Sequence, residues 1–503
     1  MIATLDGPLT RLERIGLIVS LLVAGALMWP VREQITDRTY FWIRYADQLA
    51  HGHGLVFNPN ERIYNCTSPL PVTLVADGIA LGLNGLAVAR AFGIIASLVS
   101  IALFLQLMRR TVDSPAVRVL ATLTWAAQAW MLQWSCVGLG TPLAMALVLA
   151  GFVAFTEGKQ WGDRPVRTGA LWSLAALASV GAVMLVVLWT IALLVDANNR
   201  AAIRRLVYGL APVVGIYGAW LAFTHFYYGS IWPQVLALGP SRDTGWAQVL
   251  GNVAAQLRIA WGGGGLLGLG WLGVKMLGGR RMWARHRSAL QYLPWLWVFA
   301  LPALYASRNV EVQTRHLVLV APVAYWLAWR ALHTWWAGAP ATPRAPWRAA
   351  LLAGAVAALV IAQNLVEYRG TIVPSMSTSS RALRRSFVKW GERLRRESPA
   401  GASVASPEIG ALAYTSRLRV IDLTGLMTPA LAPLLQLHAR RDVVPELAIA
   451  QVARPLYIVD ASPPAELLAR SPFRAAFTLL DSAEGYSLYR LDWAVADSLR
   501  SRL

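Results

Sequence analysis

The chain has 503 residues, of which 56% are hydrophobic and only 14% are charged, and its mean hydropathy is +0.47. A water-soluble protein of this length has no core large enough to bury so much apolar surface, so the composition indicates a membrane protein. The formal charge is +20. The basic residues stand in short clusters between apolar runs, which favours a role in membrane orientation and argues against nucleic-acid binding.

About 11 apolar runs are candidates for membrane-spanning helices. The first run, residues 15–29, follows Arg11 and Arg14 and lacks a convincing signal-peptidase site, so we expect an uncleaved anchor. The other runs are 91–108, 119–134, 142–155, 170–178, 181–195, 206–223, 259–277, 290–305, 317–329 and 349–366.

One further apolar run, residues 70–83, determines which side of the membrane each loop faces. If it does not span and the N-terminus is cytoplasmic, every arginine-rich loop falls on the cytoplasmic side, as the positive-inside rule requires. If it spans, all later clusters move outside. We therefore expect 70–83 to be an embedded or interfacial helix on the outer face. The clusters are Arg109/Arg110, Lys159/Arg164/Arg167, Arg200/Arg204/Arg205, Arg280/Arg281/Arg285/Arg287 and Arg330/Arg344/Arg348.

Composition changes after Val366, which predicts two domains. Residues 1–370 form a polytopic α-helical membrane domain that includes a long outer loop at 31–87, and residues 371–503 form a periplasmic soluble α/β domain. Residues 371–380 read as a polar linker and 381–396 as a basic amphipathic helix with Leu383, Phe387, Trp390 and Leu394 on one side. Strand-like runs at 418–423, 455–459, 475–480 and 486–491 alternate with helical runs at 431–440, 444–453 and 464–469.

Signatures of common soluble enzymes are missing from the sequence. It contains no Walker loop, no H-E-x-x-H and no G-x-S-x-G. The glycines at 262–265 favour close helix packing, and His51-Gly52-His53-Gly54 favours a turn over a metal site. Cys66 and Cys136 have no spacing typical of a metal or disulfide framework. No acidic cluster suits Mg²⁺, so the default is a reaction without metal or other cofactor.

The outer loop carries the most specific pattern, because residues 37–69 read D-R-T-Y-F-W-I-R-Y-A, then H-G-H-G-L-V-F-N-P-N-E-R. This stretch resembles the first periplasmic loop of a bacterial family of GT-C-type glycosyltransferases, similar to arabinofuranosyltransferase-like and mannosyltransferase-like membrane proteins. That loop looks like D-D-A-Y-I-x-x-R-Y-A, then G-H-G-L-V-[FY]-N-P-G-E-R. Further similar stretches lie at 138–143, 227–233, 315–317, 407–411 and 420–426.

The resemblance implies a GT-C-like fold and transfer of a sugar from a polyprenyl phosphate to a cell-envelope acceptor at the periplasmic face of the bacterial inner membrane. Such chemistry needs a carboxylate that takes the proton of the acceptor hydroxyl and donors that balance the phosphate leaving group. The resemblance assigns the first role to Asp37. It assigns donor-phosphate or substrate binding to Arg38, Arg44, Tyr45, His53, Asn58, Glu61, Tyr228 and Arg315.

Several polar positions of the family's pattern are altered. Arg38 replaces the second aspartate, Gly140 replaces the acid of G-L-E-T-P-L, Ser179 stands in the family's Arg-Pro-acid turn, and 64–66 read Y-N-C in place of E-G-Y. An alternative function is therefore a catalytically inactive protein of the same fold that binds the lipid or assists assembly.

Two further alternatives stay open at this level. The segment 39–49 is amphipathic, so it can be a strut on the membrane surface in which Asp37 merely pairs with Arg38 or Arg44. A transporter would carry ionisable residues along a path through the membrane, whereas the apolar runs hold almost none beyond Arg258 and Lys275.

Overall fold

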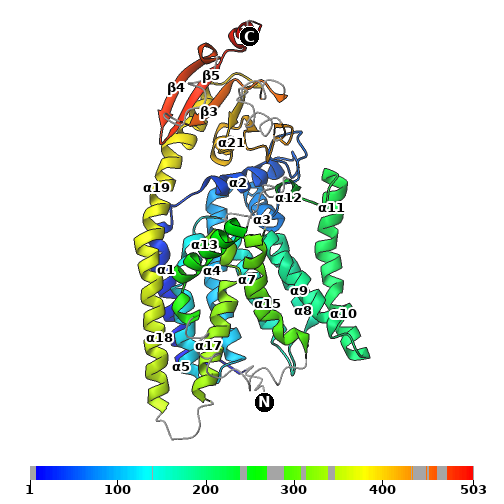
Figure 1. The fold of residues 1–503 in the computed structure, drawn as a ribbon, viewed down its shortest axis with the longest axis vertical. Helices are drawn as coiled ribbons and strands as arrows, with labels where there is room; N and C mark the ends of the chain where they lie inside the picture. Colours follow the sequence, from blue (N-terminus) through cyan, green and yellow to red (C-terminus); the bar gives the residue numbers. More distant parts are fainter. Residues whose placement is uncertain are drawn as a thin grey trace.

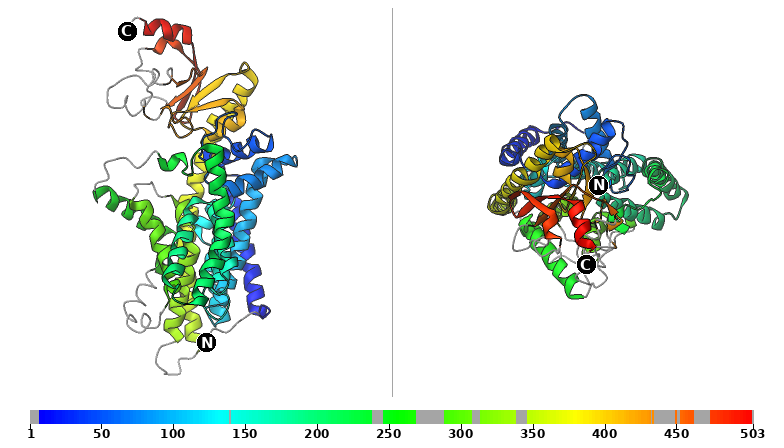
Figure 2. Two further views of the ribbon diagram at one scale, coloured as in Figure 1. Left: turned by 90° about the vertical axis from the view of Figure 1, so that its right-hand side faces the viewer. Right: turned by 90° about the horizontal axis from the view of Figure 1, so that it is seen from above.

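The computed structural model describes residues 7–138, 140–237, 246–268, 288–307, 313–337, 346–431, 433, 449, 452–461 and 473–501. A bundle of long helices forms most of the molecule, and a five-stranded sheet stands over one end of it (Figure 1). In the view from above (Figure 2, right) the strands lie over the bundle rather than beside it. The arrangement therefore has two parts, the bundle and a C-terminal sheet unit at 403–501.

The helices of the described residues have the following bounds: α1 Arg11–Met28, α2 Asp37–Ala50, α3 Pro69–Ala80, α4 Gly85–Arg109, α5 Pro115–Ala126, α6 Ala129–Ser135, α7 Thr141–Phe155, α8 Pro165–Ala178, α9 Val183–Val195, α10 Arg200–Pro212, α11 Ala219–Tyr228, α12 Gln234–Ala237, α13 Trp246–Gly262, α15 Leu293–Ser307, α16 Thr314–Leu317, α17 Ala321–Ala337, α18 Pro346–Glu367, α19 Val373–Leu383, α20 Lys389–Glu397, α21 Gly410–Ser416 and α24 Trp493–Arg500.

Within the described residues, five helical stretches are long and apolar enough to cross a membrane: Arg11–Val31, Gly85–Arg109, Arg200–Tyr228, Ala289–Ser307 and Ala350–Glu397. Shorter apolar helices, among them Thr141–Phe155 and Val180–Val195, accompany them. Large apolar side chains are exposed on these helices, including Leu22, Val195 and Phe226, which are 67%, 68% and 85% exposed. A protein in water rarely carries so extended an apolar surface, and hydrocarbon would cover it in a bilayer.

Two of the predicted spans differ from the observed helices. The run 119–134 is broken into α5 and α6, because the Gln128 side chain accepts a hydrogen bond from the Met131 N–H and so begins a new helix. The run 259–277 overlaps the end of α13, and its later part lies outside the described residues.

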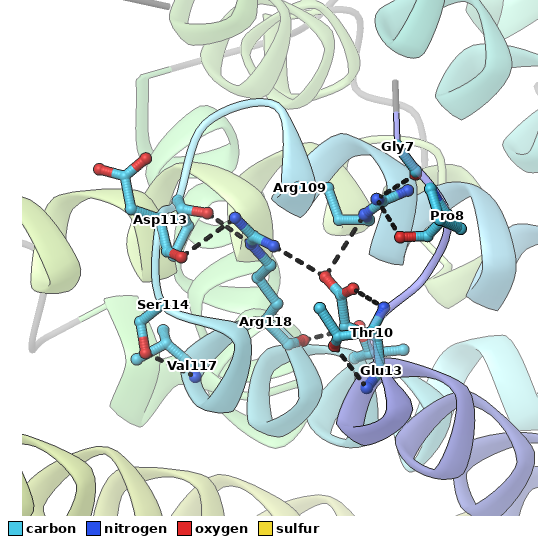
Figure 3. Close-up of polar contacts among 11 residues, drawn as sticks. Gly7, Pro8, Thr10, Glu13, Arg109, Asp113, Ser114, Val117 and Arg118 are labelled. Carbon is cyan, nitrogen blue, oxygen red and sulfur yellow. Dashed lines mark hydrogen bonds and ion pairs between the residues drawn. The ribbon is translucent and has the colours of Figure 1, made fainter. Parts of the chain in front are cut away.

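A buried ion cluster joins the start of α1 to the adjoining ends of α4 and α5 (Figure 3). The fully buried Glu13 carboxylate lies 2.8 Å from a guanidinium nitrogen of Arg118 and 3.4 Å from Arg109. Thr10 caps α1 through a reciprocal pair of hydrogen bonds with Glu13. Arg118 also donates to the Val112 and Asp113 carbonyls. Glu13 thus balances the buried Arg118 and the partly exposed Arg109 while it completes a helix cap.

We predict that Glu13→Gln destabilises the bundle strongly, because it leaves the buried Arg118 and the partly exposed Arg109 without the carboxylate that they share. Loss of one member of a buried pair costs about 3–5 kcal/mol in the free energy of unfolding. Thermal unfolding in detergent should show a lower Tm. Glu397→Gln is the control, since Glu397 pairs with Arg393 at the surface, is 55% exposed, and should change stability by less than about 1 kcal/mol. Equal Tm values for the two variants would contradict the role of Glu13.

Several arginine clusters predicted to share one side do gather at one end of the bundle. Arg110, Arg164 and Arg167 all approach the Glu157 carboxylate, at 3.9, 3.6 and 2.9 Å. Arg109 donates to the Gly7 carbonyl, which places this group beside the N-terminal end of α1. The sheet unit lies at the opposite end (Figure 1).

Helices α2 and α3 form a layer between the bundle and the sheet unit (Figure 1). Helix α3 corresponds to the run 70–83 and has 12 residues, which makes it about 18 Å long and too short to cross a bilayer. Helix α2 buries Tyr40, Ile43 and Ala46 as the amphipathic pattern predicts. Its polar residues Arg44 and Asp47 are buried as well, because the sheet unit covers the side that the sequence alone assigned to water.

The sheet has the strand order β2-β1-β3-β5-β4, with β1 Ser403–Ser406, β2 Arg419–Asp422, β3 Tyr457–Ala461, β4 Phe477–Ala483 and β5 Tyr486–Leu491. Strands β2, β1 and β3 are parallel, and β3, β5 and β4 are antiparallel. The four predicted strands are present. The prediction missed β1, whose four small residues are all buried. The predicted helical runs at 431–453 and 464–469 lie almost wholly outside the described residues.

One continuous helix connects the bundle to the sheet unit. Helices α18, α19 and α20 follow one another with single π-helical segments between them, at Tyr368–Ile372 and Arg384–Val388. The predicted polar linker at 371–380 is therefore helical. The predicted amphipathic helix at 381–396 is confirmed, since Leu383, Phe387, Trp390 and Leu394 are all buried against the sheet unit.

Candidate functional site

A cavity of about 770 Å³ lies where the bundle meets the sheet unit. Its walls come from both parts of the molecule: the start of α2, the loop before α3, α6 and α16 on one side, and α19, the β1–α21 loop, the loop after β2 and the β4–β5 turn on the other. The ionisable side chains that line it are Asp37, Arg38, Arg315, Glu408, Asp422 and Glu484.

The Asp37 carboxylate joins α2 to α21. Its Oδ2 accepts from the Gly410 N–H at 2.9 Å and its Oδ1 from the Ala411 N–H at 2.7 Å. These N–H groups have no partner within α21, because they belong to its first turn. Gly410 permits the contact, since a Cβ there would collide with the Asp37 carbonyl oxygen and the Phe41 amide nitrogen. The two helices therefore meet backbone to backbone.

Glu408 is the second carboxyl group of the cavity. It stands just before α21, where its backbone carbonyl accepts from the Ser406 hydroxyl at 2.7 Å, and its side chain shares a hydrogen bond with Asp37. Burial and the adjacent Asp37 charge raise the pKa of Glu408 to about 7. Burial also raises the pKa of Asp37, against the opposing effect of its two N–H donors. The pair thus holds a proton near neutral pH.

Two guanidinium groups face the same cavity. Arg38 follows Asp37 on α2, and Arg315 lies on α16 with its Nε 3.2 Å from His316 Nε2. Burial lowers the pKa of Arg38, and the nearby Asp37 opposes that shift. Burial likewise lowers the pKa of His316, to about 3, with the positive charges of Arg315 and Arg38 adding to the effect. His316 is therefore neutral between two cations.

Of the nine residues selected from the sequence, the structure brings Asp37, Arg38 and Arg315 together in the cavity. Arg44 and Tyr45 are buried beneath it in the core that α2 shares with the sheet unit. Arg44 donates to the Phe57 carbonyl at 3.1 Å, and the Tyr45 hydroxyl contacts the Met427 sulfur at 3.6 Å. Burial lowers the pKa of Arg44 to about 10.

Asn58 and Glu61 bind the sheet unit outside the cavity. The Asn58 amide donates to the Val420 carbonyl at 2.8 Å and accepts from the Val420 N–H at 3.1 Å, so it extends the edge of strand β2. Glu61 forms a 2.6 Å ion pair with Arg419 and accepts from Asn58. In addition, the largely buried Asp47 pairs with Arg417. These contacts attach the loop to the sheet.

The remaining two selected residues also lie away from the cavity. His53 occupies the predicted turn, between glycines at φ +79° and +87°. Tyr228 donates its hydroxyl to the Leu55 carbonyl and stacks on Tyr64, with ring centroids 5.0 Å apart. Within the described residues, no group of three or more His, Cys, Asp or Glu side chains is arranged to hold a metal ion.

Sequence reasoning did not select Glu408, Asp422 or Glu484. Glu408 and Asp422 lie within the stretches P-E-I-G-A and V-I-D-L-T-G-L that resemble the family, so the signal was present in the sequence. Only the fold shows that these two loops, at the ends of parallel strands β1 and β2, come to the Asp37 end of α2.

The altered position Gly140 is closely packed. A Cβ there would lie 2.5 Å from the Pro71 side chain and 2.9 Å from the Ala178 carbonyl oxygen. The space that a glutamate would occupy is therefore filled by α3 and the end of α8. An acidic residue cannot be restored at this position without moving those helices.

An apolar groove of about 300 Å³ lies among α13, α15 and α17. Two short segments lead from it to the polar cavity. Helix α6 contributes Trp130 to the groove and Trp134 to the cavity, and the segment of α16 contributes Leu317 to the groove and Arg315 to the cavity. An apolar and a charged compartment are thus neighbours.

Comparison with known proteins supports this description of the fold. ArnT from Cupriavidus metallidurans bound to undecaprenyl phosphate superposes with a TM-score of 0.63 at 14% identity, over 96% of this chain and 98% of that chain. The oligosaccharyltransferase AglB from Archaeoglobus fulgidus, in complex with an inhibitory peptide and a dolichol-phosphate, gives a TM-score of 0.58 at 13% identity, over 89% of this chain and 69% of that chain. The chain therefore shares the fold of these two proteins.

Two sequence comparisons add little about activity. The family described as "Domain of unknown function (DUF8728)" matches residues 376–499, which covers the end of the long helix and the sheet unit. No curated protein matches the chain.

We predict that Asn58→Ala loosens the sheet unit, because Val420 then loses both hydrogen bonds at the open edge of β2. Leaving such a buried donor and acceptor unpaired costs about 1–3 kcal/mol. Hydrogen exchange of the Val420 amide should become faster. The exposed Asn198 provides the control, and Asn198→Ala should leave that exchange unchanged. Unchanged Val420 protection in Asn58→Ala would show that the sheet does not depend on this contact.

Proposed function

We propose that this protein is a membrane glycosyltransferase that transfers a sugar from a polyprenyl-phosphate donor to a cell-envelope acceptor on the periplasmic face of the bacterial inner membrane. The observation that carries the proposal is the cavity between the bundle and the sheet unit. The paired carboxyl groups of Asp37 and Glu408 line this cavity together with Arg38 and Arg315. Glycosyl transfer needs both charges: a base for the acceptor hydroxyl and cations for the phosphate that leaves.

The neighbouring apolar groove supports a lipid-linked donor. A polyprenyl phosphate has a long hydrocarbon chain and a charged head, and the groove and cavity offer one compartment of each kind. Guanidinium groups suit phosphate because they donate several hydrogen bonds in a fixed plane. The fold comparison points the same way, since ArnT is described as bound to undecaprenyl phosphate.

The reaction that we propose proceeds without a resident metal. Arg38 and Arg315 would hold the donor phosphate, and the Asp37–Glu408 pair would take the proton from the acceptor hydroxyl as it attacks the anomeric carbon. Partial burial of Asp37, Glu408 and Arg315 strengthens their electrostatic contacts relative to water. The N-terminus of the chain would be cytoplasmic and the sheet unit periplasmic.

One observation favours the second candidate, a catalytically inactive protein that binds the lipid. Both Asp37 carboxylate oxygens are occupied by α21 backbone N–H groups, and Gly140 leaves no room for the acid of the family's pattern. Arg38 and Arg315 would still hold a phosphate in that case. The two candidates therefore agree on binding and differ in turnover.

The test is sugar transfer by the purified full-length chain in detergent or nanodiscs, with radiolabelled polyprenyl-phosphate sugars and extracted envelope glycans as acceptors. The proposed function predicts labelled acceptor and released polyprenyl phosphate in equal amounts. Binding of polyprenyl phosphate without transfer from any donor would establish the inactive candidate. Absence of both binding and transfer would contradict both.

We predict that Arg315→Met weakens the use of donor, because the phosphate then loses a charge-assisted hydrogen bond. Such a bond to a charged group contributes about 1.5–3 kcal/mol, which corresponds to a fall of about 10- to 100-fold in kcat/KM for the donor. Arg381→Met is the control, since Arg381 is exposed on α19 and its Nε donates to the Ser377 carbonyl. Equal kcat/KM values for the two variants would remove Arg315 from the donor site.

A further inference from the structure

We propose that the C-terminal sheet unit supplies the catalytic base, Glu408, and that Asp37 acts as the residue that positions it. This inference rests on the proposed function and names the group that accepts the acceptor's proton. It also assigns a chemical role to the sheet unit, which the sequence presented as a separate soluble part. Four carboxyl groups line the described cavity wall, those of Asp37, Glu408, Asp422 and Glu484.

Three of these four groups have their oxygens engaged elsewhere. Asp37 accepts from two backbone N–H groups of α21. Asp422 accepts from the Thr424 N–H and hydroxyl through one oxygen, at 2.8 and 2.7 Å, and from the Met427 N–H through the other, at 2.8 Å. Glu484 lies 3.4 Å from Arg385 in an ion pair at the rim. These three carboxylates therefore stabilise the local structure, and their engaged oxygens are poorly placed to accept a proton from a substrate.

Glu408 differs from the other three. Its side chain shares a hydrogen bond with Asp37, it forms no ion pair within the described residues, and it is only half-buried at the cavity wall. Proline and isoleucine flank it, and the Ser406 hydroxyl holds its carbonyl, so the loop is anchored on both sides. It therefore has an oxygen available to a substrate and a defined position.

Asp37 positions this carboxyl group in two ways. Its bonds to Gly410 and Ala411 fix the start of α21, which lies two and three residues beyond Glu408. Its negative charge also disfavours ionisation of Glu408, whose pKa is raised to about 7. A base with a pKa near the working pH combines a substantial ionised fraction with a useful driving force for proton transfer.

The proposed transfer step needs no reactant other than the sugar donor and the acceptor. The acceptor hydroxyl oxygen forms a bond to the anomeric carbon while the bond between that carbon and the phosphate oxygen breaks. The bonding electron pair leaves with the polyprenyl phosphate, facing Arg38 and Arg315, and the hydroxyl proton passes to the Glu408 carboxylate. The proton then leaves to water, which restores the ionised base.

The experiment compares Glu408→Gln and Glu408→Asp with the control Glu397→Gln in the full-length protein, with size-exclusion elution and Tm as folding checks. We expect Glu408→Gln to lower kcat by about 10²-fold or more with little change in the donor KM. Glu408→Asp keeps the charge and should retain part of the activity. Glu397→Gln should behave as the wild type, because Glu397 pairs with Arg393 at the surface and does not line the cavity.

The pH profile separates a base from a structural residue. Wild-type kcat should fall as the pH drops below about 7, because protonation of Glu408 removes the base. Asp37→Asn should shift this acid limb to lower pH, since loss of the Asp37 charge makes Glu408 easier to ionise. Glu408→Gln should lose the limb from its residual activity.

The outcomes distinguish this inference from the function on which it rests. If the wild type transfers sugar and Glu408→Gln folds and transfers equally well with the same acid limb, the role of Glu408 is overturned and the proposed function stands. If the wild type binds polyprenyl phosphate and never transfers sugar, the proposed function itself fails, and the assignment of Glu408 falls with it.

Discussion

Asp37 is partly buried where a membrane-type helical bundle meets a sheet, and a carboxylate at such a position must find hydrogen-bond donors or lose its charge. It finds them on the first turn of α21, at 2.9 and 2.7 Å. This contact requires Gly410, since any side chain there would strike the α2 backbone. The position of the β1–α21 loop and the presence of Glu408 beside Asp37 both depend on it.

The rest of the interface makes the sheet unit part of the site rather than an appendage. Asn58 extends strand β2, Asp47 and Glu61 pair with Arg417 and Arg419, and the helix from α18 to α20 runs from the bundle into the sheet's core. Several residues that the resemblance associated with substrate therefore have structural partners here. Their contacts attach the sheet unit to the bundle, whatever further role the proposed reaction gives them.

The packing around position 140 and the cavity at Arg38 give two of the altered positions a physical explanation. An acid at position 140 has no space, because Pro71 and Ala178 fill it. Arg38 takes the place of a second aspartate and brings a cation to the cavity, while Glu408 brings a carboxyl group from the other side. Carboxyl and guanidinium groups, the two kinds of charge that the proposed reaction requires, therefore line one cavity.

The sequence by itself determined the local features of this protein. Apolar runs indicated most of the long helices and the short helix before α4, and strand-like runs located four of the five strands. Strand β1 escaped because Ser403–Ser406 has no hydrophobic pattern. Only the tertiary structure decided that α2 is covered on both sides and that the Arg44 side chain is buried in the core. It also decided that Asp37 binds the start of α21 and that Glu408 lies beside Asp37. These facts depend on contacts between residues more than 370 positions apart, which no local periodicity records.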